Sequence, residues 1–234
     1  MNNIIISATI TNKLEPKAIN DSNVIDVICN FTTIGTERTS TIKVTGWGKT
    51  ADVLIGMAIG DAIVIEGRVE MNKIPQEDGK STTIAKIVAS RVTKLIGALN
   101  CQFNTVNLVG RTGQDPEMQL FDTGKSVCTT SLAVNRRSKE KQTDWFTLKI
   151  WGKTGEVANK YAPKGSTIGI TGSLEIESWT DKVSGQIKTR PIIKPNELDL
   201  LGSKRDNQEA APSYGTPGST LHQSRQTNEL DVPF

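Results

Sequence analysis

The clearest alternation of apolar and polar positions lies at residues 144–153, which read DWFTLKIWGK. With a period of two, the Phe, Leu and Ile of this stretch fall on one face, as expected for a strand that packs on a core. The other face carries Trp145, Lys149 and Trp151, and a lysine is almost never buried without a partner. The pattern therefore predicts an exposed face that stacks flat rings and holds negative charge. The alternative is a strand buried on both faces, with Lys149 extending to solvent.

A related strand occurs earlier in the chain. The sequence WGKT at residues 47–50 recurs at residues 151–154, and Gly67 recurs as Gly172, at a shift of 104 or 105 residues. The matches stay in register across the intervening apolar run, and a period this long exceeds that of solenoid repeats. The chain is therefore predicted to hold two copies of one domain. The predicted domains are residues 1–99 and 100–204.

The second copy shows five strand patterns and one helical pattern. Gly172 lies in the middle of the fourth strand, where a barrel strand must bend sharply. Five strands with a helix between the third and fourth follow the plan of the five-stranded Greek-key barrel known as the OB (oligonucleotide/oligosaccharide-binding) fold. The first copy reads in the same way, with a strand at 41–47 and a hairpin at 72–80, so the predicted fold class is all-β with two tandem OB-fold barrels. In the second copy the predicted strands are residues 104–111, 126–135, 144–151, 167–179 and 188–200, and the predicted helix is 154–161.

The composition changes after residue 204. Residues 205–225 are dominated by Asn, Gln, Ser, Thr, Gly, Pro and Ala. Such a segment buries too little apolar surface to offset the entropy of ordering, so residues 205–234 are predicted to be a disordered tail. The last six residues, 229–234, turn acidic and apolar, and composition alone favours an ordinary chain end there.

Charge and reactive residues exclude several function classes. The net charge of +3, from 28 Lys and Arg against 25 Asp and Glu, is mild, so any basic surface must be local. The cysteines Cys29, Cys101 and Cys128 form no cluster, and the only histidine, His222, lies in the predicted tail. Nucleotide-binding and hydrolase motifs are absent, as are a signal peptide and a membrane span. We therefore expect a non-enzymatic cytoplasmic protein without metal or cofactor.

Binding of nucleic acid is better supported. Trp179 falls on the polar side of the fourth strand, together with Glu175 and Glu177, which are read as a solvated face. A ring that stacks on a base contributes about 1–3 kcal/mol, and cations beside the rings can follow the phosphates. The second copy has 15 basic and 11 acidic residues, against 11 and 10 in the first. The predicted contacts are Trp145, Trp151, Trp179, Lys149, Lys153, Arg136, Arg137, Lys139 and Lys141 in the second copy and, more weakly, Trp47, Lys43 and Lys49 in the first.

Several motifs of the second copy resemble the bacterial single-stranded-DNA-binding protein family. The resemblance implies sequence-independent binding and protection of single-stranded DNA in replication, recombination and repair, in the nucleoid region of the cytoplasm. It also implies base stacking on Trp145, Trp151 and Trp179, although family members often carry phenylalanine at the position of Trp151. The motifs are NLVGR at 107–111, DPE at 115–117, LAVNR at 132–136, DWF at 144–146, WGKT at 151–154 and WTD at 179–181.

The resemblance extends to the end of the chain. The sequence DVPF looks like the acidic tip of the family, which is a docking peptide for replication, recombination and repair proteins. Only two acidic residues are present, so a lower affinity for partners is expected. The residues implied in docking are Glu229, Leu230, Asp231, Val232, Pro233 and Phe234.

The first copy departs from the family pattern. Thr41 stands at the position of Trp145, and Ile74 at that of Trp179. Family members with two such domains per chain dimerise, so the resemblance implies a homodimer with four OB folds and a diverged first copy. One alternative is a primosome-type OB-fold assembly protein that acts mainly through protein contacts. Another, disfavoured by the missing histidine and metal carboxylates, is a nuclease on this fold.

Overall fold

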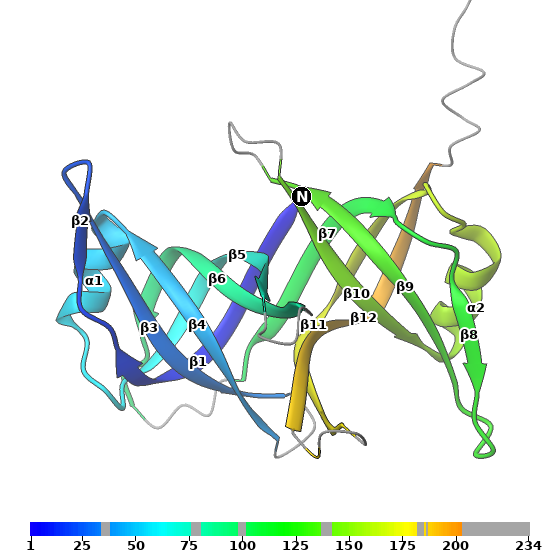
Figure 1. Cartoon of the computed structure of the whole chain (residues 1–234), viewed down its shortest axis with the longest axis horizontal. Helices are drawn as coiled ribbons and strands as arrows, with labels where there is room; N and C mark the ends of the chain where they lie inside the picture. The colour runs from blue at the N-terminus through cyan, green and yellow to red at the C-terminus, as the bar shows by residue number, and fades with distance from the viewer. Residues whose placement is uncertain are drawn as a thin grey trace, which may run out of the picture.

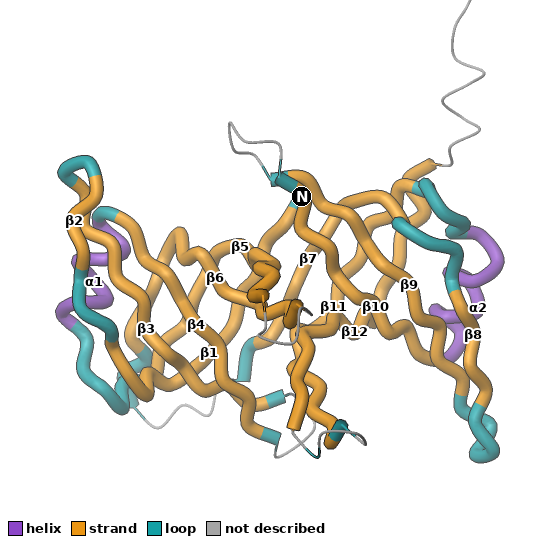
Figure 2. Tube along the Cα trace, in the orientation of Figure 1, coloured by secondary structure: helices purple, strands orange, loops and turns teal. Residues whose placement is uncertain are grey.

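The computed structural model describes residues 1–33, 38–75, 81–97, 102–136, 142–181, 185 and 187–202. In these residues the chain forms two β-barrels side by side, and strands make up most of both (Figures 1 and 2). The first barrel consists of β1 (Asn2–Lys13), β2 (Lys17–Ile19), β3 (Ser22–Thr32), β4 (Thr39–Trp47), α1 (Lys49–Gly56), β5 (Ala62–Pro75) and β6 (Ser81–Lys94). The second barrel consists of β7 (Asn104–Thr112), β8 (Glu117–Leu120), β9 (Ser126–Asn135), β10 (Thr143–Trp151), α2 (Gly152–Tyr161), β11 (Thr167–Thr180) and β12 (Ile187–Gly202).

Each barrel closes in the same way. In the second, β7 pairs with both β9 and β11, and β10 lies parallel to β12. In the first, β1 pairs with both β3 and β5, and β4 lies parallel to β6. The prediction of two tandem OB barrels is confirmed, and the five main strands of the second copy fall within a few residues of the predicted ranges.

The short strands β2 and β8 were not predicted from the sequence. Both are mostly exposed and have only three and four residues, so they leave little alternation of apolar and polar positions. The hairpin predicted at residues 72–80 begins later, because β5 continues to Pro75. Residues 76–80 lie outside the described chain.

The sharp bend expected at Gly172 is confirmed. The pairing of β11 with β12 shifts register between Thr171 and Gly172, and that of β5 with β6 shifts between Glu66 and Gly67. A Cβ atom added at Gly172 would lie 2.3 Å from the carbonyl oxygen of Lys194. Glycine is therefore required at this bend because the neighbouring backbone fills the space of a side chain.

The helix of the second barrel starts two residues before the predicted range, at Gly152. It packs directly against β10, since a Cβ atom at Gly155 would lie 2.4 Å from the carbonyl oxygen of Ile150. Its buried face holds Gly155 and Ala158, and it ends where the Ala162 N–H donates to the Ala158 carbonyl oxygen. The helix thus covers one end of the barrel and continues directly from Trp151. With 8 and 10 residues, the two helices of the described chain are too short to cross a bilayer.

The two barrels are joined by their first strands. β1 pairs with β7 in antiparallel register, with Asn2 opposite Leu108 and Ile6 opposite Asn104. Side chains repeat the symmetry: the Asn2 amide donates to the Val69 carbonyl oxygen at 2.7 Å, and the Asn104 amide donates to that of Leu174 at 2.8 Å. The tandem copies are therefore related by an approximate two-fold axis through a continuous sheet.

The described cysteines are core residues. Cys29 and Cys128 are fully buried, and burial raises the pKa of the Cys29 thiol to about 12. Both side chains pack as small apolar groups in their barrels. Cys101, His222 and the whole predicted tail, residues 205–234, lie outside the described chain.

Candidate nucleic-acid interface

Three tryptophans of the second barrel are exposed. Trp145, Trp151 and Trp179 keep 50%, 41% and 43% of their surface accessible, while Phe146 and Leu148 on the opposite face of β10 are fully buried. The predicted alternation of β10 is confirmed, and the alternative of a strand buried on both faces is wrong.

The three rings are spread over β10 and β11, two strands that both pair with β12. Trp145 and Trp151 lie six residues apart on β10, which corresponds to roughly 20 Å along a strand. Trp179 lies near the tip of the long hairpin formed by β11 and β12, where the Arg190 guanidinium sits 5.6 Å from the centre of its ring. Flat apolar surfaces with a cation against one of them form a path suited to a chain of bases and phosphates.

A carboxylate lies inside this surface. Lys149 Nζ approaches Glu177 Oε1 at 2.5 Å, and Arg190 Nη2 approaches Glu177 Oε2 at 3.0 Å. Burial alone would raise the pKa of Glu177, but hydrogen bonds from Lys149 and Arg190 hold it below its ordinary value. Both cations are therefore paired with Glu177, and an anion such as phosphate would have to replace a carboxylate oxygen at each of them.

The sequence reads Glu175 and Glu177 as a solvated face, and the structure corrects this. Glu175 pairs with Lys194 at 2.7 Å, and both carboxylates are largely buried, with side chains 12% and 25% exposed. Long cationic side chains from the adjacent strand β12 and from β10 cover them. The acidic residues thus set the local charge of the candidate surface.

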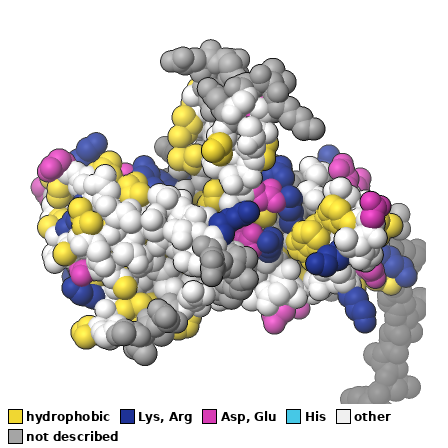
Figure 3. Space-filling model, turned by 90° about the horizontal axis from the view of Figure 1, so that it is seen from below, with side chains coloured by type: hydrophobic (Ala, Val, Ile, Leu, Met, Phe, Trp, Pro, Cys, Tyr) yellow, Lys and Arg dark blue, Asp and Glu magenta, His cyan; other side chains and the backbone are white. Residues whose placement is uncertain are grey.

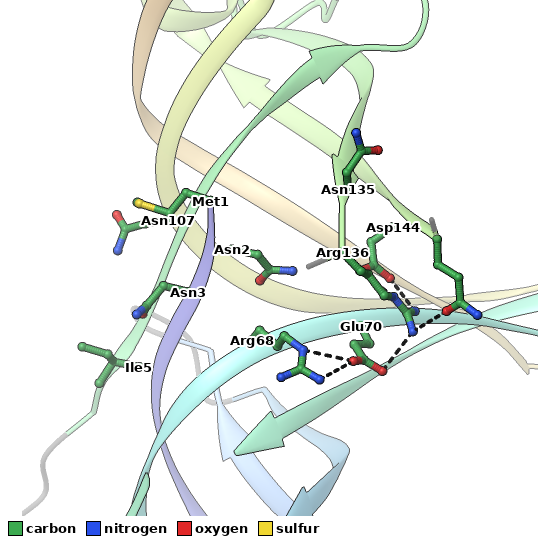
Figure 4. A pocket seen from close by; sticks show the side chains of 11 residues that line it. Met1, Asn2, Asn3, Ile5, Arg68, Glu70, Asn107, Asn135, Arg136 and Asp144 are labelled. Carbon is green, nitrogen blue, oxygen red and sulfur yellow. Dashed lines mark hydrogen bonds and ion pairs between the residues drawn. The ribbon is translucent and has the colours of Figure 1, made fainter. Parts of the chain in front are cut away.

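The structure also corrects the prediction for Arg136. Its guanidinium bridges the two barrels: it donates to Asp144 Oδ1 at 2.7 Å, to Glu70 Oε2 at 3.1 Å and to the Met71 carbonyl oxygen at 3.2 Å. Figure 4 shows it pointing from the end of β9 toward β5 of the first barrel, beside a pocket lined also by Asn2 and Arg68. Arg136 is thus held by buried carboxylates instead of facing solvent, and it joins the barrels.

The other predicted cations have different positions. Lys153 is exposed in the first turn of α2, next to Trp151. Arg137, Lys139 and Lys141 lie outside the described residues. Figure 3 shows that basic and acidic side chains are interspersed on the face formed by the lower edges of the barrels. Among the side chains visible in this view the charges are mixed and form no broad basic stripe.

The first barrel has a reduced form of the surface. Trp47 is 47% exposed at the end of β4, and Lys49 is exposed at the start of α1. Lys43 pairs with Asp26 at 3.1 Å. Burial would raise the pKa of Asp26, but hydrogen bonds from Thr45 and Lys43 lower it. The first barrel thus exposes one tryptophan, Trp47, and pairs Lys43 with a carboxylate, whereas the second barrel exposes three tryptophans.

Sequence reasoning missed Phe121 and Arg190 at the candidate surface. Phe121 follows β8 and stacks on Trp151, with ring centres 5.8 Å apart and an angle of 15° between the ring planes. The available signal was an aromatic residue directly before the turn sequence DTGK. Because β8 was not recognised as a strand, Phe121 could not be placed beside Trp151.

Comparison with known proteins identifies relatives of both barrels. The model of the Single-strand binding protein family matches residues 1–95 and 103–201. A protein of Synechocystis sp. named single-stranded DNA-binding protein 1 is 55% identical over 109 residues, which cover 46% of this chain and 90% of that protein. The protein of the same name from Nostoc sp. is 48% identical over 111 residues, covering 47% of this chain and 93% of its own.

A solved structure shares the whole arrangement. The wild-type single-stranded DNA binding protein from Thermus aquaticus aligns with a TM-score of 0.65, covering 94% of this chain and 97% of that chain. The sequence identity is 20%, so this likeness concerns the fold alone. The curated relatives match about half of the chain, whereas the solved structure matches nearly all of it. Both results agree with a chain that holds two copies of one domain.

Proposed function

Because this chain belongs to the single-strand binding protein family, we propose that it binds single-stranded DNA independently of base sequence and protects it during replication, recombination and repair. The observation that carries the proposal is the set of three exposed tryptophans on one surface of the second barrel. Each base has a flat π-face, so stacking on these rings does not depend on the sequence.

The second barrel supplies the main binding surface. Bases stack on Trp145, Trp151 and Trp179, while phosphates take the place of Glu177 at Lys149 and Arg190. Lys153 adds a cation beside Trp151. The basic residues Arg137, Lys139 and Lys141, outside the described chain, are proposed to extend the phosphate path.

We propose no catalytic step and no cofactor. Within the described ranges, no group of three His, Cys, Asp or Glu side chains is placed to bind a metal ion. A nuclease on this fold would need such a group or an acid and base pair at the stacking surface. Incubation of the protein with labelled single-stranded DNA and magnesium tests the point, since any degradation would contradict the proposal.

The first barrel, residues 1–99, is proposed to complete the assembly and to add a weak contact through Trp47, Lys43 and Lys49. Two chains are proposed to form a homodimer that presents four barrels. The tail, residues 205–234, is proposed to carry a docking tip for replication, recombination and repair proteins. The apolar members of the tip enter a groove on the partner and the acidic members meet basic residues at its rim. The tip residues are Glu229, Leu230, Asp231, Val232, Pro233 and Phe234.

Titration of the intrinsic tryptophan fluorescence tests the proposed function. Oligo(dT) should quench the emission strongly, whereas duplex DNA of equal length should leave it nearly unchanged. An equal response to both would contradict single-strand binding. The alternative, a primosome-type assembly protein, predicts little quenching by either DNA.

A further inference from the structure

The ring of Phe121 lies at the edge of the candidate surface, outside the set of tryptophans described above. It is 39% exposed and stacks on Trp151 with ring centres 5.8 Å apart and an angle of 15° between planes. This separation lies in the range of an offset-stacked pair, in which each ring leaves part of a face uncovered. The pair therefore extends the flat apolar surface of Trp151 toward the hairpin between β8 and β9.

The hairpin holds Phe121 in place. Its N–H donates to the Lys125 carbonyl oxygen at 2.9 Å, and its carbonyl oxygen accepts from the Gly124 N–H at 2.9 Å. Gly124 has a φ of 75°, a backbone conformation that favours glycine. The backbone that carries the ring is thus held before any ligand binds, and the ring already packs on Trp151, which lowers the entropy cost of using it.

A shallow hollow adjoins the two rings. It is lined by Phe121, Asp122, Thr123, Lys125 and Trp151. Lys125 is exposed at the base of β9, so a cation lies next to the flat apolar surface. An aromatic ring with a neighbouring cation is the same pair of features that suits the rest of the surface to bases and phosphates.

The first barrel offers an internal comparison. Trp47 occupies the position of Trp151, but the matching hairpin, residues 17–22, reads KAINDS and holds no aromatic residue. Its turn at Asn20 and Asp21 is also shorter than the turn after Phe121. The extra ring and the extended turn thus occur in the barrel that has the larger stacking surface.

We propose that Phe121 is a fourth base-stacking ring of the second barrel, so that the bound strand continues past Trp151 onto the β8–β9 hairpin and meets Lys125 with a phosphate. This inference rests on the proposed single-strand binding and adds a subsite to it. The ring acts by direct contact with a base, besides bracing Trp151.

Photocross-linking tests the contact in the wild-type protein. The probe is an oligo(dT) in which some bases are replaced by 5-iododeoxyuridine, and the adducts are located by mass spectrometry after proteolysis. We expect an adduct on Phe121 in addition to adducts on the tryptophans. Adducts on the tryptophans alone would overturn the subsite and leave the proposed function intact, whereas no binding of the probe at all would overturn both.

Affinity measurements separate direct contact from support of Trp151. Phe121→Leu keeps an apolar side chain but removes the π-face, and it should weaken oligo(dT) binding about 5-fold or more, the lower end of the cost of a lost stack. The matched control Leu120→Ala, at the adjacent exposed position, should leave affinity within about 2-fold of wild type, because it removes no ring. In a Trp151→Ala background, Phe121→Leu should still weaken binding. No effect in that background would reduce Phe121 to a positioning residue and overturn the subsite.

Discussion

Arg136 of the second barrel and Glu70 of the first form an ion pair at 3.1 Å across the junction of the two domains. Glu70 also pairs with Lys86 at 3.2 Å, and Arg136 also pairs with Asp144 at 2.7 Å. The carboxylates of Glu70 and Asp144 are 7% and 1% exposed, so both acidic groups are buried, while the Arg136 and Lys86 side chains are 15% and 24% exposed. The junction therefore combines the β1–β7 pairing with a buried network of charges.

Glu70→Gln should destabilise the protein because Lys86 loses this counter-charge and Arg136 keeps only Asp144 as a carboxylate partner. Losing hydrogen bonds to a buried charged group costs about 1–3 kcal/mol, and this is the expected loss in the free energy of unfolding by urea. Glu66→Gln is the matched control, since Glu66 is 42% exposed and lies 3.9 Å from Arg91. It should cost less than about 1 kcal/mol. Equal stability of the two variants would mean that the junction does not depend on this charge.

The same substitution should change the response to acid. Burial alone would raise the pKa of Glu70, but Lys86, Arg68 and Arg136 together hold it below its ordinary value of 4.5. Because the pKa of Glu70 is lower in the folded than in the unfolded protein, its ionised carboxylate stabilises the fold above pH 4.5. This stabilisation is lost as the pH falls through the pKa of the folded state. Urea titrations below pH 4.5 should therefore show a steeper loss of stability in the wild type than in Glu70→Gln. If stability fell equally steeply with pH in both proteins, Glu70 would not be the carboxylate whose protonation destabilises the junction.

Replacement of the exposed rings should affect binding and spare folding. Trp145→Ala, Trp151→Ala and Trp179→Ala should each weaken oligo(dT) binding by about 1–3 kcal/mol. Phe146→Ala, on the buried face of the same strand, should instead cost about 3–5 kcal/mol of stability. Fluorescence anisotropy and thermal unfolding measure the two effects. A collapsed thermal transition in the tryptophan variants, with normal binding per folded molecule, would show that the rings serve the core.

Glu177 restrains the cations of the surface, so Glu177→Gln should strengthen binding. Removing its charge frees Lys149 and Arg190 for phosphates, and a gain of about 1 kcal/mol is expected from the lost repulsion. The plot of log affinity against log salt should become steeper by about 0.7 for each additional phosphate neutralised. Asp199→Asn changes the net charge equally on an exposed part of β12 away from the hairpin tip, so it should change affinity less. Weaker binding by Glu177→Gln would show that the carboxylate positions the cations.

Deletion of residues 229–234 should separate the two proposed activities. Affinity for oligo(dT) should stay equal or rise slightly, because negative charge near a phosphate-binding surface is removed. The deletion variant should no longer pull down replication, recombination and repair proteins from a bacterial lysate. Phe234→Ala should retain only a small part of this binding. A marked loss of DNA binding would contradict the assignment of the tip to protein docking.

The sequence predicted those features that local patterns encode. The exposure of Trp145 and Trp151 follows from alternation within one strand, and the bend at Gly172 follows from a glycine within an apolar run. The role of Arg136 could not be predicted, because its partner Glu70 lies 66 residues away in the other barrel. Phe121 was missed because β8 is a short exposed strand, and the β1–β7 pairing because both strands look like ordinary barrel strands.

The central claim is that single-stranded DNA is bound mainly by the rings of the second barrel. Full-length protein is needed to test it, since separating the barrels would expose the edges of β1 and β7 and the charges at the junction. The chain has four tryptophans, so Trp47→Phe leaves only those of the second barrel, and the triple change Trp145→Phe, Trp151→Phe and Trp179→Phe leaves only Trp47. Titration of both variants with oligo(dT) should quench the emission of the first strongly and at low DNA concentration, and that of the second weakly. Equal quenching of both at the same concentrations would contradict the claim.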